Sequence, residues 1–563
     1  MKISHLKKLV ESFEAHLGSP WKEGSLMNFN HSLYLDEREE LPQEEISKIQ
    51  KWGYMNYLIP SQLGGKLDSL LTLYFINRAI SRRDLTTSIA LGLTFLASLP
   101  IWIGGKKEQQ IKLAAHIQAG HIGALALTEE NHGTDLSANE MQAVFIEGKG
   151  WKLNGSKWCV NYATLGTTAT ILCRTHPSGG PLGFSLFFLD KMKIQSGITT
   201  SEKLPTHGVR GLDISGFSLS QVTLPPEALI GEKNKGLEIT YKTLQISRAL
   251  CTNLSIGSAD TALRLTLLFS LQRQLYGQPA FNIPAVKHRL AECFTYILIA
   301  ECTAIIGLRA GTLLPQRMSF WSSIGKFLIP KISEKIVNEC ALVMGARAFL
   351  RTTEWAIFQK IRRDNQIVGL FDGSSQVNLF IIASNLLPQV KLQKESQPLS
   401  PILGDLFNLE KDVPAFSGQG LHIFNQGVDE IINGFKHLES AAIHDSIQQV
   451  QFEITALQDQ ILRQAQHNKF DERGLNEFRL AENYSWLFAA CCTIYFWIYN
   501  QDLLHPELKD SKWVTMAVQL ILSNINRQIP SIPIALYSHQ SECLKHFLDN
   551  KQMFSPLPIS IQD

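Results

Sequence analysis

The sequence carries almost no excess charge. Its 53 Lys and Arg stand against 51 Asp and Glu, so the formal net charge over 563 residues is only +2. Proteins that attract nucleic acid or an acidic membrane surface carry a marked basic balance. We therefore expect no nucleic-acid partner. The length and a hydrophobic content of 45% predict about two to four globular domains instead.

Cysteine is sparse and shows no pattern. Nine cysteines are scattered along the chain without a CxxC spacing. An odd number of this kind fits buried, reduced thiols better than a disulfide framework or a zinc site. Even the adjacent pair Cys491 and Cys492 lies in an apolar segment that is typical of a core. We expect no bound metal.

We identify no apolar run of membrane-spanning length. The longest such run, Ser485–Tyr499, falls below the ~20 residues that a span requires. The first residues of the chain also lack the apolar core and cleavage site of a signal peptide. These observations predict a cytoplasmic protein without an integral membrane segment.

The sequence does show a change of pattern along its length. Helix-length apolar segments come first, short extended runs separated by turn residues follow, and long helical patterns then return. A polar stretch that ends in Pro398 marks a further boundary. We expect a helical N-terminal domain, a middle β domain, a C-terminal helical bundle and a helical extension at 1–120, 121–234, 235–393 and 394–563.

One amphipathic helix stands out in the extension. Six apolar residues alternate at spacings of four and three, which places them on one helix face: Ile443, Ile447, Val450, Ile454, Leu457 and Ile461. The stripe covers under three heptads, so packing against the body is favoured over a free coiled coil.

A single carboxylate beside a glycine turn is the feature with the most chemical content. Residues 363–376 hold an Arg-Asp pair, six connecting residues, and then an aromatic residue, an acid, Gly, Ser, Ser and Gln. This order resembles the closing motif of the acyl-CoA dehydrogenase family, in which the acid before the glycine is the catalytic base. That acid is Asp372 here, where the family usually has Glu. In some members the base instead precedes a helix arginine, but that place holds Ser247 before Arg248.

Four other segments resemble family motifs in the expected order, so the likeness extends over roughly residues 45 to 387. Residues 126–135 are similar to A-L-T-E-P-x-x-G-S-D and residues 153–163 to L-N-G-x-K-x-W-I-T-N-A. Residues 272–277 are similar to E-R-x-x-F-G, and 342–349 to Q-x-x-G-G-x-G-F. The chain departs from these motifs at Glu130 for Pro, Cys159 for Trp, Asn161 for Thr and Leu342 for Gln. The ring that stacks on the flavin is then either absent or supplied by Trp158.

The resemblance implies an α-β-α architecture that binds FAD. By it, Asp372 is the catalytic residue. Contacts to the cofactor fall to Leu127, Thr128, Gly133, Thr134, Cys159, Asn161, Arg273, Tyr276, Ser374 and Gln376. Contacts to the substrate fall to Thr134, Arg248, Phe371 and Gly373. Guanidinium groups pair well with phosphate oxygens, and the resemblance implies that Arg273 reaches the FAD pyrophosphate of a neighbouring subunit.

The implied reaction is α,β-dehydrogenation of an acyl thioester, on CoA or on a carrier protein, to the 2-enoyl thioester. Asp372 removes the α-proton while the β-hydrogen leaves as hydride to flavin N5. An electron-transfer flavoprotein is the implied acceptor, and a homodimer the implied assembly. Three alternatives stay open at this point: a flavin oxidase of acyl-CoA or nitroalkane type, a noncatalytic scaffold that keeps the fold, and a role for Asp372 as a simple helix cap.

Overall fold

A computed structural model describes residues 2–395, 401–467 and 470–563. Helices dominate the first 118 residues, and a polar side chain caps the start of three of them, α2, α4 and α5. The Ser69 hydroxyl accepts the Leu71 N–H at 3.2 Å, and the Asp84 carboxylate accepts the Thr87 N–H at 2.8 Å. The six α-helices are α1 (Ile3–Leu17), α2 (Phe29–Arg38), α3 (Gln43–Trp52), α4 (Leu70–Ser81), α5 (Leu85–Gly104) and α6 (Lys107–Gln118).

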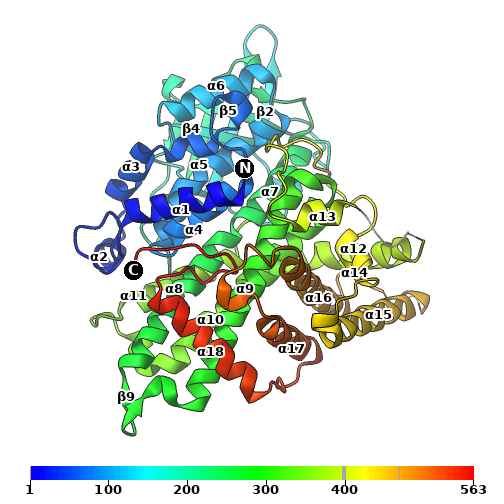
Figure 1. The fold of residues 1–563 in the computed structure, drawn as a ribbon. Coiled ribbons are helices and arrows are strands. Elements are labelled where there is room, and N and C mark those ends of the chain that lie inside the picture. Colours follow the sequence, from blue (N-terminus) through cyan, green and yellow to red (C-terminus); the bar gives the residue numbers. More distant parts are fainter. Residues whose placement is uncertain (1, 396–400, 468–469) are drawn as a thin grey trace.

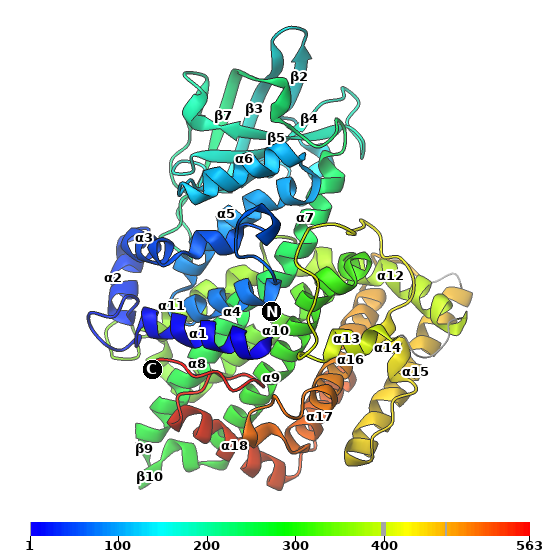
Figure 2. The same ribbon diagram turned by 45° about the horizontal axis from the view of Figure 1, so that its top comes forward.

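Strands follow in the middle of the chain and form one mixed sheet (Figure 2). The sheet order is β6-β7-β3-β2-β4-β5-β8, and β1 pairs parallel with β4. The strands are β1 (Gly123–Ala126), β2 (Gln142–Ile146), β3 (Gly150–Asn161), β4 (Thr168–Arg174), β5 (Phe184–Asp190), β6 (Ile198–Thr200), β7 (Ile214–Leu224) and β8 (Leu229–Ile230). α5 packs against β1 and β4, which joins the sheet to the first helices.

A second set of helices returns after the sheet and builds the largest part of the core. The helices α8 and α9 pack against α10, as does α12. This set comprises α7 (Gly236–Leu250), α8 (Thr252–Gln272), α9 (Pro284–Leu313), α10 (Met318–Met344), α11 (Ile357–Asn365) and α12 (Ser375–Glu395). A two-strand hairpin, β9 (Gln274–Leu275) and β10 (Gln278–Pro279), projects between α8 and α9.

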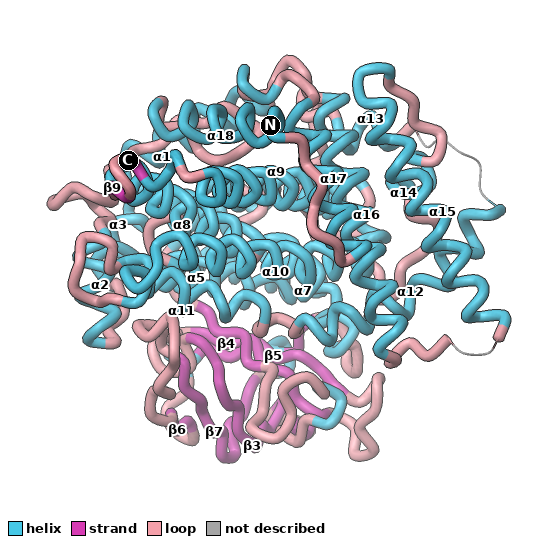
Figure 3. The backbone as a smooth tube through the Cα atoms, turned by 90° about the horizontal axis from the view of Figure 1, so that it is seen from below, coloured by secondary structure: helices cyan, strands magenta, loops and turns pink. Residues whose placement is uncertain are grey.

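The C-terminal extension is helical and lies against this bundle (Figures 1 and 3). α16 packs on α9 and α12, and α18 packs on α9. Five residues of the predicted amphipathic stripe lie on α15 and the first, Ile443, directly precedes it; all six are buried. The helices are α13 (Ile402–Phe407), α14 (Glu430–Phe435), α15 (His444–Gln466), α16 (Leu475–Tyr499), α17 (Lys512–Asn526) and α18 (Ile534–Asp549). The predicted fold class, mainly α with a central β domain and a helical extension, is confirmed.

Short 3₁₀ helices connect the longer elements: η1 (Tyr54–Leu58), η2 (Ser61–Leu63), η3 (Leu136–Ala138), η4 (Lys191–Lys193), η5 (Pro226–Ala228), η6 (Ala280–Asn282), η7 (Pro315–Arg317), η8 (Gly345–Phe349), η9 (Gln366–Gly369), η10 (Ala441–Ile443) and η11 (Pro506–Leu508). Of these, η9 leads directly into the loop that carries Asp372.

Two helices correct the expectation that no apolar run reaches membrane-spanning length. α5 and α9 are both long and apolar enough by length and composition. Their apolar windows are 78% and 89% buried inside the protein, because other helices and the sheet cover them. The run Ser485–Tyr499 forms part of α16, whose side chains are also mostly buried.

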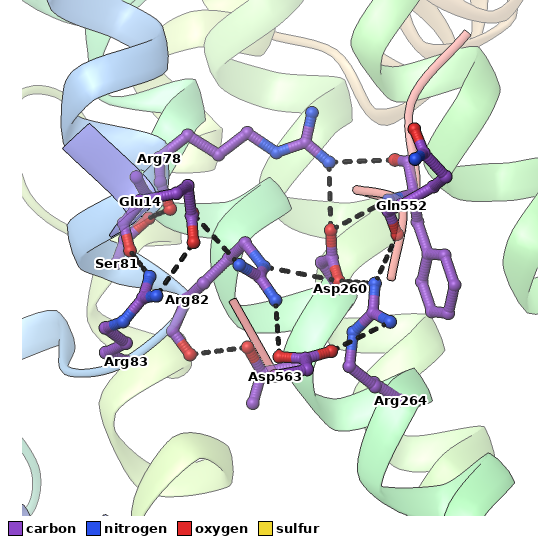
Figure 4. A network of polar contacts seen from close by, with 12 residues as sticks. Glu14, Arg78, Ser81, Arg82, Arg83, Asp260, Arg264, Gln552 and Asp563 are labelled. Carbon is purple, nitrogen blue, oxygen red and sulfur yellow. Dashed lines mark hydrogen bonds and ion pairs between the residues drawn. The ribbon is translucent and has the colours of Figure 1, made fainter. Parts of the chain in front are cut away.

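The end of the chain is tied to the N-terminal helices by a buried ionic network (Figure 4). Arg82 contacts Glu14 at 3.0 Å and Asp563 at 3.1 Å, and Asp260 lies among three arginines: Arg78 at 3.2 Å, Arg82 at 3.6 Å and Arg264 at 3.3 Å. Burial by itself raises the pKa of Asp260, but the attraction of the arginines outweighs it and holds that pKa below its ordinary value. The network joins residues that are hundreds of positions apart.

Candidate functional site

Asp372 lies in the loop between η9 and α12, in a left-handed turn. Its φ is 54° and that of Gly373 is 93°. Asp enters the left-handed region more readily than most residues, which gives a physical reason for Asp where the related motif has Glu. No N–H of α12 donates to its carboxylate in the described part of the chain, so Asp372 does not cap that helix.

Arg248 of α7 holds this turn in place. Its Nε donates to the backbone oxygen of Asp372 at 3.0 Å, and its Nη1 donates to Ser323 at 3.4 Å. A Cβ on Gly373 would lie 2.8 Å from the guanidinium, so the glycine is what allows this approach. Burial lowers the pKa of Arg248, and the nearby Asp372 opposes that effect. Arg248 therefore fixes the backbone of the predicted base while its own charge faces that residue.

Phe371, next to Asp372, is held from its other side. The ammonium of Lys326 lies 4.2 Å from the centre of the Phe371 ring and donates to the backbone oxygen of Val368 at 2.6 Å. Lys326 is 1% exposed. The turn is thus anchored by two buried cations that act on its backbone and ring and leave the carboxylate itself unpaired.

A cavity opens beside the carboxylate. Asp372 and Phe371 form part of its wall, and the remainder comes from α4, α5, the end of α7 and the start of α8. Most of the lining is apolar, including Leu93, Leu96 and Leu254. Ser247 also lines it, but its hydroxyl donates to the backbone oxygen of Leu244 at 3.2 Å. The cavity has the shape and polarity to take a short hydrocarbon chain with its functional end at Asp372.

The predicted cofactor residues of the β domain lie on two segments that are bonded together. The backbone oxygen of Thr128 accepts the N–H of Trp158 at 3.0 Å. The ammonium of Lys157 reaches the Leu127 oxygen at 3.0 Å and the Glu129 carboxylate at 2.8 Å. The sequence analysis does not single out Lys157, although a lysine in the middle of the strand segment 153–163 was the available signal. These bonds set the loop after β1 against β3, while Gly133 and Thr134 remain exposed at its tip.

A β-bulge interrupts β3 at Trp158 and Cys159. The pairing with β7 shifts between Lys157 and Val160, and Cys159 takes a φ of 56°. Bulges re-aim side chains and are frequent beside active sites. Trp158 is 38% exposed, so an aromatic face is present one position before Cys159. Just beyond the bulge, the buried Oδ1 of Asn161 has no hydrogen-bond partner among the described residues.

These features fit the binding of a flavin. The orphaned Oδ1 of Asn161 is suited to an N–H of a bound ring, and Trp158 offers an aromatic surface beside it. Cys159 is exposed and supplies no ring. Of the predicted residues of the closing motif, Gln376 is exposed and Ser374 half-buried at the start of α12.

Two predicted cofactor residues are not brought to this site within one chain. Arg273 and Tyr276 belong to the β9–β10 hairpin, which lies at the opposite end of the molecule from the β domain (Figure 2). Tyr276 is 95% exposed and has a φ of 52°. Leu342, at the Gln position of a related motif, is 68% exposed near the end of α10. A second chain would be needed to place the hairpin beside a cofactor.

The described residues contain no group of three or more His, Cys, Asp or Glu placed to hold a metal ion. Eight of the nine cysteines are buried and all are free.

Comparison with known proteins covers the same part of the chain. Sequence models of the acyl-CoA dehydrogenase N-terminal, middle and C-terminal domains match residues 29–121, 124–222 and 234–387. The caffeyl-CoA reductase-Etf complex subunit CarC of Acetobacterium woodii is 27% identical over 357 residues, which are 63% of this chain and 92% of that protein.

Solved structures show the same fold. Butyryl-CoA dehydrogenase from Megasphaera elsdenii is 22% identical with a TM-score of 0.62, and covers 68% of this chain and 97% of its own. The prolyl acyl carrier protein oxidase AnaB is 20% identical with a TM-score of 0.61, and covers 68% and 98%. The chain belongs to the acyl-CoA dehydrogenase family and is an FAD-dependent oxidoreductase.

Proposed function

We propose that this protein dehydrogenates an acyl thioester between its α and β carbons, with Asp372 as the base that takes the α-proton. The observation that carries the proposal is an unpaired carboxylate in the wall of a largely apolar cavity, on a turn anchored by Arg248 and Lys326. A general base must stand within reach of the proton that it removes. The cavity wall is where the α-carbon of an acyl chain would lie.

The turn also provides a donor for the thioester carbonyl. The N–H of Asp372 has no hydrogen-bond acceptor within the described residues. A free backbone N–H stabilises the negative charge that develops on the carbonyl oxygen as the α-proton leaves. Bound FAD would supply the acceptor for the β-hydrogen, which would leave as hydride with the electron pair of its own C–H bond. The electron pair of the α C–H bond would then form the C=C bond. Asp372 keeps the α-proton on its carboxylate.

Further proposals concern the partners of the reaction. We propose an electron-transferring flavoprotein as the acceptor, which is supported by a relative named as a subunit of a reductase-Etf complex. The thioester is carried by CoA or by a carrier protein. A cytoplasmic homodimer is the proposed assembly, since the exposed β9–β10 hairpin with Arg273 and Tyr276 needs a second chain to meet a cofactor.

An anaerobic substrate screen tests the function. Purified protein is mixed with saturated acyl-CoA and acyl-carrier thioesters, and loss of flavin absorbance is followed. We expect bleaching with at least one of them, and Asp372→Asn should slow it by about 100- to 10,000-fold while FAD stays bound. Asp459→Asn, at an exposed position on α15, is the matched control and should bleach normally.

The same assay separates the alternatives. Failure of every thioester to bleach the flavin would overturn the dehydrogenase proposal. If oxygen is admitted after bleaching, rapid flavin reoxidation with oxygen consumption would place the protein with the oxidases. Full activity of Asp372→Asn would remove the base assignment.

A further inference from the structure

Three polar side chains interrupt the apolar wall of the cavity beside Asp372. They are Asn77 on α4, Ser88 on α5 and Asn253 at the start of α8. All three are buried, with exposed fractions of 6%, 2% and 3%. A cavity for a plain hydrocarbon chain has no use for such groups, because a buried polar atom without a partner is costly.

Asn253 presents an acceptor whose direction is fixed. Its Nδ2 donates to the backbone oxygen of Leu250, and a reversed amide would set two oxygens against each other. Its backbone oxygen accepts the Ser81 hydroxyl at 3.0 Å, which ties this residue to α4. The buried Oδ1 is left without a hydrogen-bond partner among residues 2–395, 401–467 and 470–563.

Asn77 presents a donor on the neighbouring helix. Its Oδ1 accepts the Tyr54 hydroxyl at 2.7 Å, and its backbone oxygen accepts the Ser88 hydroxyl at 3.2 Å. The first of these bonds occupies Oδ1 and leaves Nδ2 as the hydrogen-bond donor of this amide at the cavity wall. Asn77 and Ser81 are one turn apart on α4, so both amides belong to the region where α4 meets α8.

The charges of the lining residues limit which acyl groups the cavity can bind. Asp372 is the one carboxylate among its lining residues, and none of them is Lys or Arg. An acyl group with its own carboxylate would find no counter-charge there, and an ammonium would pair with the base that the reaction requires. An uncharged group that both donates and accepts hydrogen bonds satisfies Asn253 and Asn77 together.

We propose that the natural substrate is a polar, uncharged acyl thioester whose chain carries a hydroxyl or amide group, recognised by Asn253 Oδ1 and Asn77 Nδ2. This inference rests on the proposed dehydrogenation and adds to it the class of acyl group. Asn253 is then a specificity-determining residue that acts on the chain and takes no part in proton transfer.

Pairs of acyl-CoA substrates of equal length test the inference on the wild-type protein. One member of each pair is a plain alkanoyl thioester, and the other carries a hydroxyl on the γ-carbon or a later one. We expect kcat/KM to favour one hydroxylated isomer by about 10- to 100-fold, as loss of a buried hydrogen bond predicts. Binding of the matching 2-enoyl products, measured by calorimetry, should show the same preference.

Asn253→Leu removes the acceptor at similar volume and should bring the preference to within about threefold of unity, since a residue that only shapes the wall discriminates weakly. Leu254→Met, at the next cavity position, is the control: it should alter both substrates alike and keep their ratio. If Asn253→Leu does not fold, the wild-type substrate pairs still decide.

The outcomes are distinct. Equal use of both substrates by the wild-type protein, or a preference for the alkanoyl member, would overturn the inference and leave the dehydrogenase proposal standing. An unchanged preference in Asn253→Leu would also overturn it, because Oδ1 would then serve a buried water. Failure of every thioester to bleach the flavin would instead sink the proposed function itself.

Discussion

Two groups of charges in this protein, one around Asp260 and one around Asp372, both combine Asp with Arg but differ in how the carboxylate is paired. In the ionic network, Asp260 lies within 3.6 Å of three arginines and is fully buried. Beside the cavity, Arg248 donates to the backbone oxygen of Asp372 and to Ser323, and no cation pairs with the Asp372 carboxylate in the described chain. The contrast teaches that carboxylates neutralised on all sides hold elements together, while one left unpaired at a cavity wall is available for proton transfer.

Asp260→Asn gives the largest expected effect on stability. It leaves Arg78, Arg82 and Arg264 short of a buried counter-charge, and removal of one partner from a buried pair costs about 3–5 kcal/mol. Asp372→Asn is the matched control, with an expected change within about 1 kcal/mol. Denaturant unfolding measures both. Equal losses of unfolding free energy in the two variants would contradict the claim that Asp260 stabilises the fold while Asp372 does not.

The fold follows from local pattern more readily than this network does. The apolar stripe of α15 and the strand-length runs inside β2, β4 and β5 are visible in the sequence because period and turn residues are local signals. Asp260 and Asp563 are separated by more than 300 positions, and nothing in their surroundings marks them as partners. The apolar length of α5 and α9 can be read from the sequence, but their burial by other helices and the sheet is a tertiary property.

The site divides in the same way. The resemblance of the residue order to the family's motifs indicates Asp372 and the segments around Thr128 and Asn161 as candidates. The bulge at Cys159 could not be predicted, because it depends on how β3 pairs with β7. The sequence does not indicate Asn253 for a different reason. A single Asn in a helix can serve many purely structural roles, and only the structure shows that it lines the cavity with an unpaired Oδ1.

Arg248→Lys should reduce turnover by about 10- to 100-fold. Lys cannot reproduce the directed Nε bond to the Asp372 oxygen, and a shift of about 1 Å in a reacting group costs roughly 100-fold. The measurement is the anaerobic rate of flavin bleaching. Arg479→Lys on the exposed side of α16 is the control. A variant with the wild-type rate would show that the turn needs no such anchor.

Acid should weaken the ionic network around Asp260 and Glu14. The arginines hold the pKa of Asp260 and of Glu14 below their ordinary values, even though burial acts in the other direction. A depressed pKa contributes stability that is fully present above the unfolded value, about 4, and that is lost as pH falls through the folded value. Unfolding free energies measured from pH 7 to pH 3 should fall below about pH 4. Asp260→Asn should show a shallower fall; a parallel curve would contradict the assignment.

Gly373→Ala gives the smallest expected effect. A left-handed φ costs an ordinary residue about 1–2 kcal/mol, and the new methyl would also press on Arg248 at 2.8 Å. Gly120→Ala is the control, because its φ is 86° and nothing lies within 4 Å of the added atom. Gly373→Ala should lose somewhat more stability than Gly120→Ala because of the contact with Arg248, and only Gly373→Ala should bleach more slowly. Equal turnover in the two variants would show that the backbone geometry at Gly373 does not affect catalysis.

The most direct test of the account is exchange of the α-proton with solvent. The probe is a 3-thia-acyl thioester, in which sulfur replaces the β-carbon, so that no β-hydrogen can leave as hydride. It is incubated with the FAD-loaded protein in D₂O, and deuterium at the α-carbon is followed by mass spectrometry. We predict that the wild-type protein exchanges this proton and that Asp372→Asn does so at least about 100-fold more slowly, with binding of the thioester retained. Exchange at the wild-type rate in Asp372→Asn would contradict the central claim that Asp372 is the base.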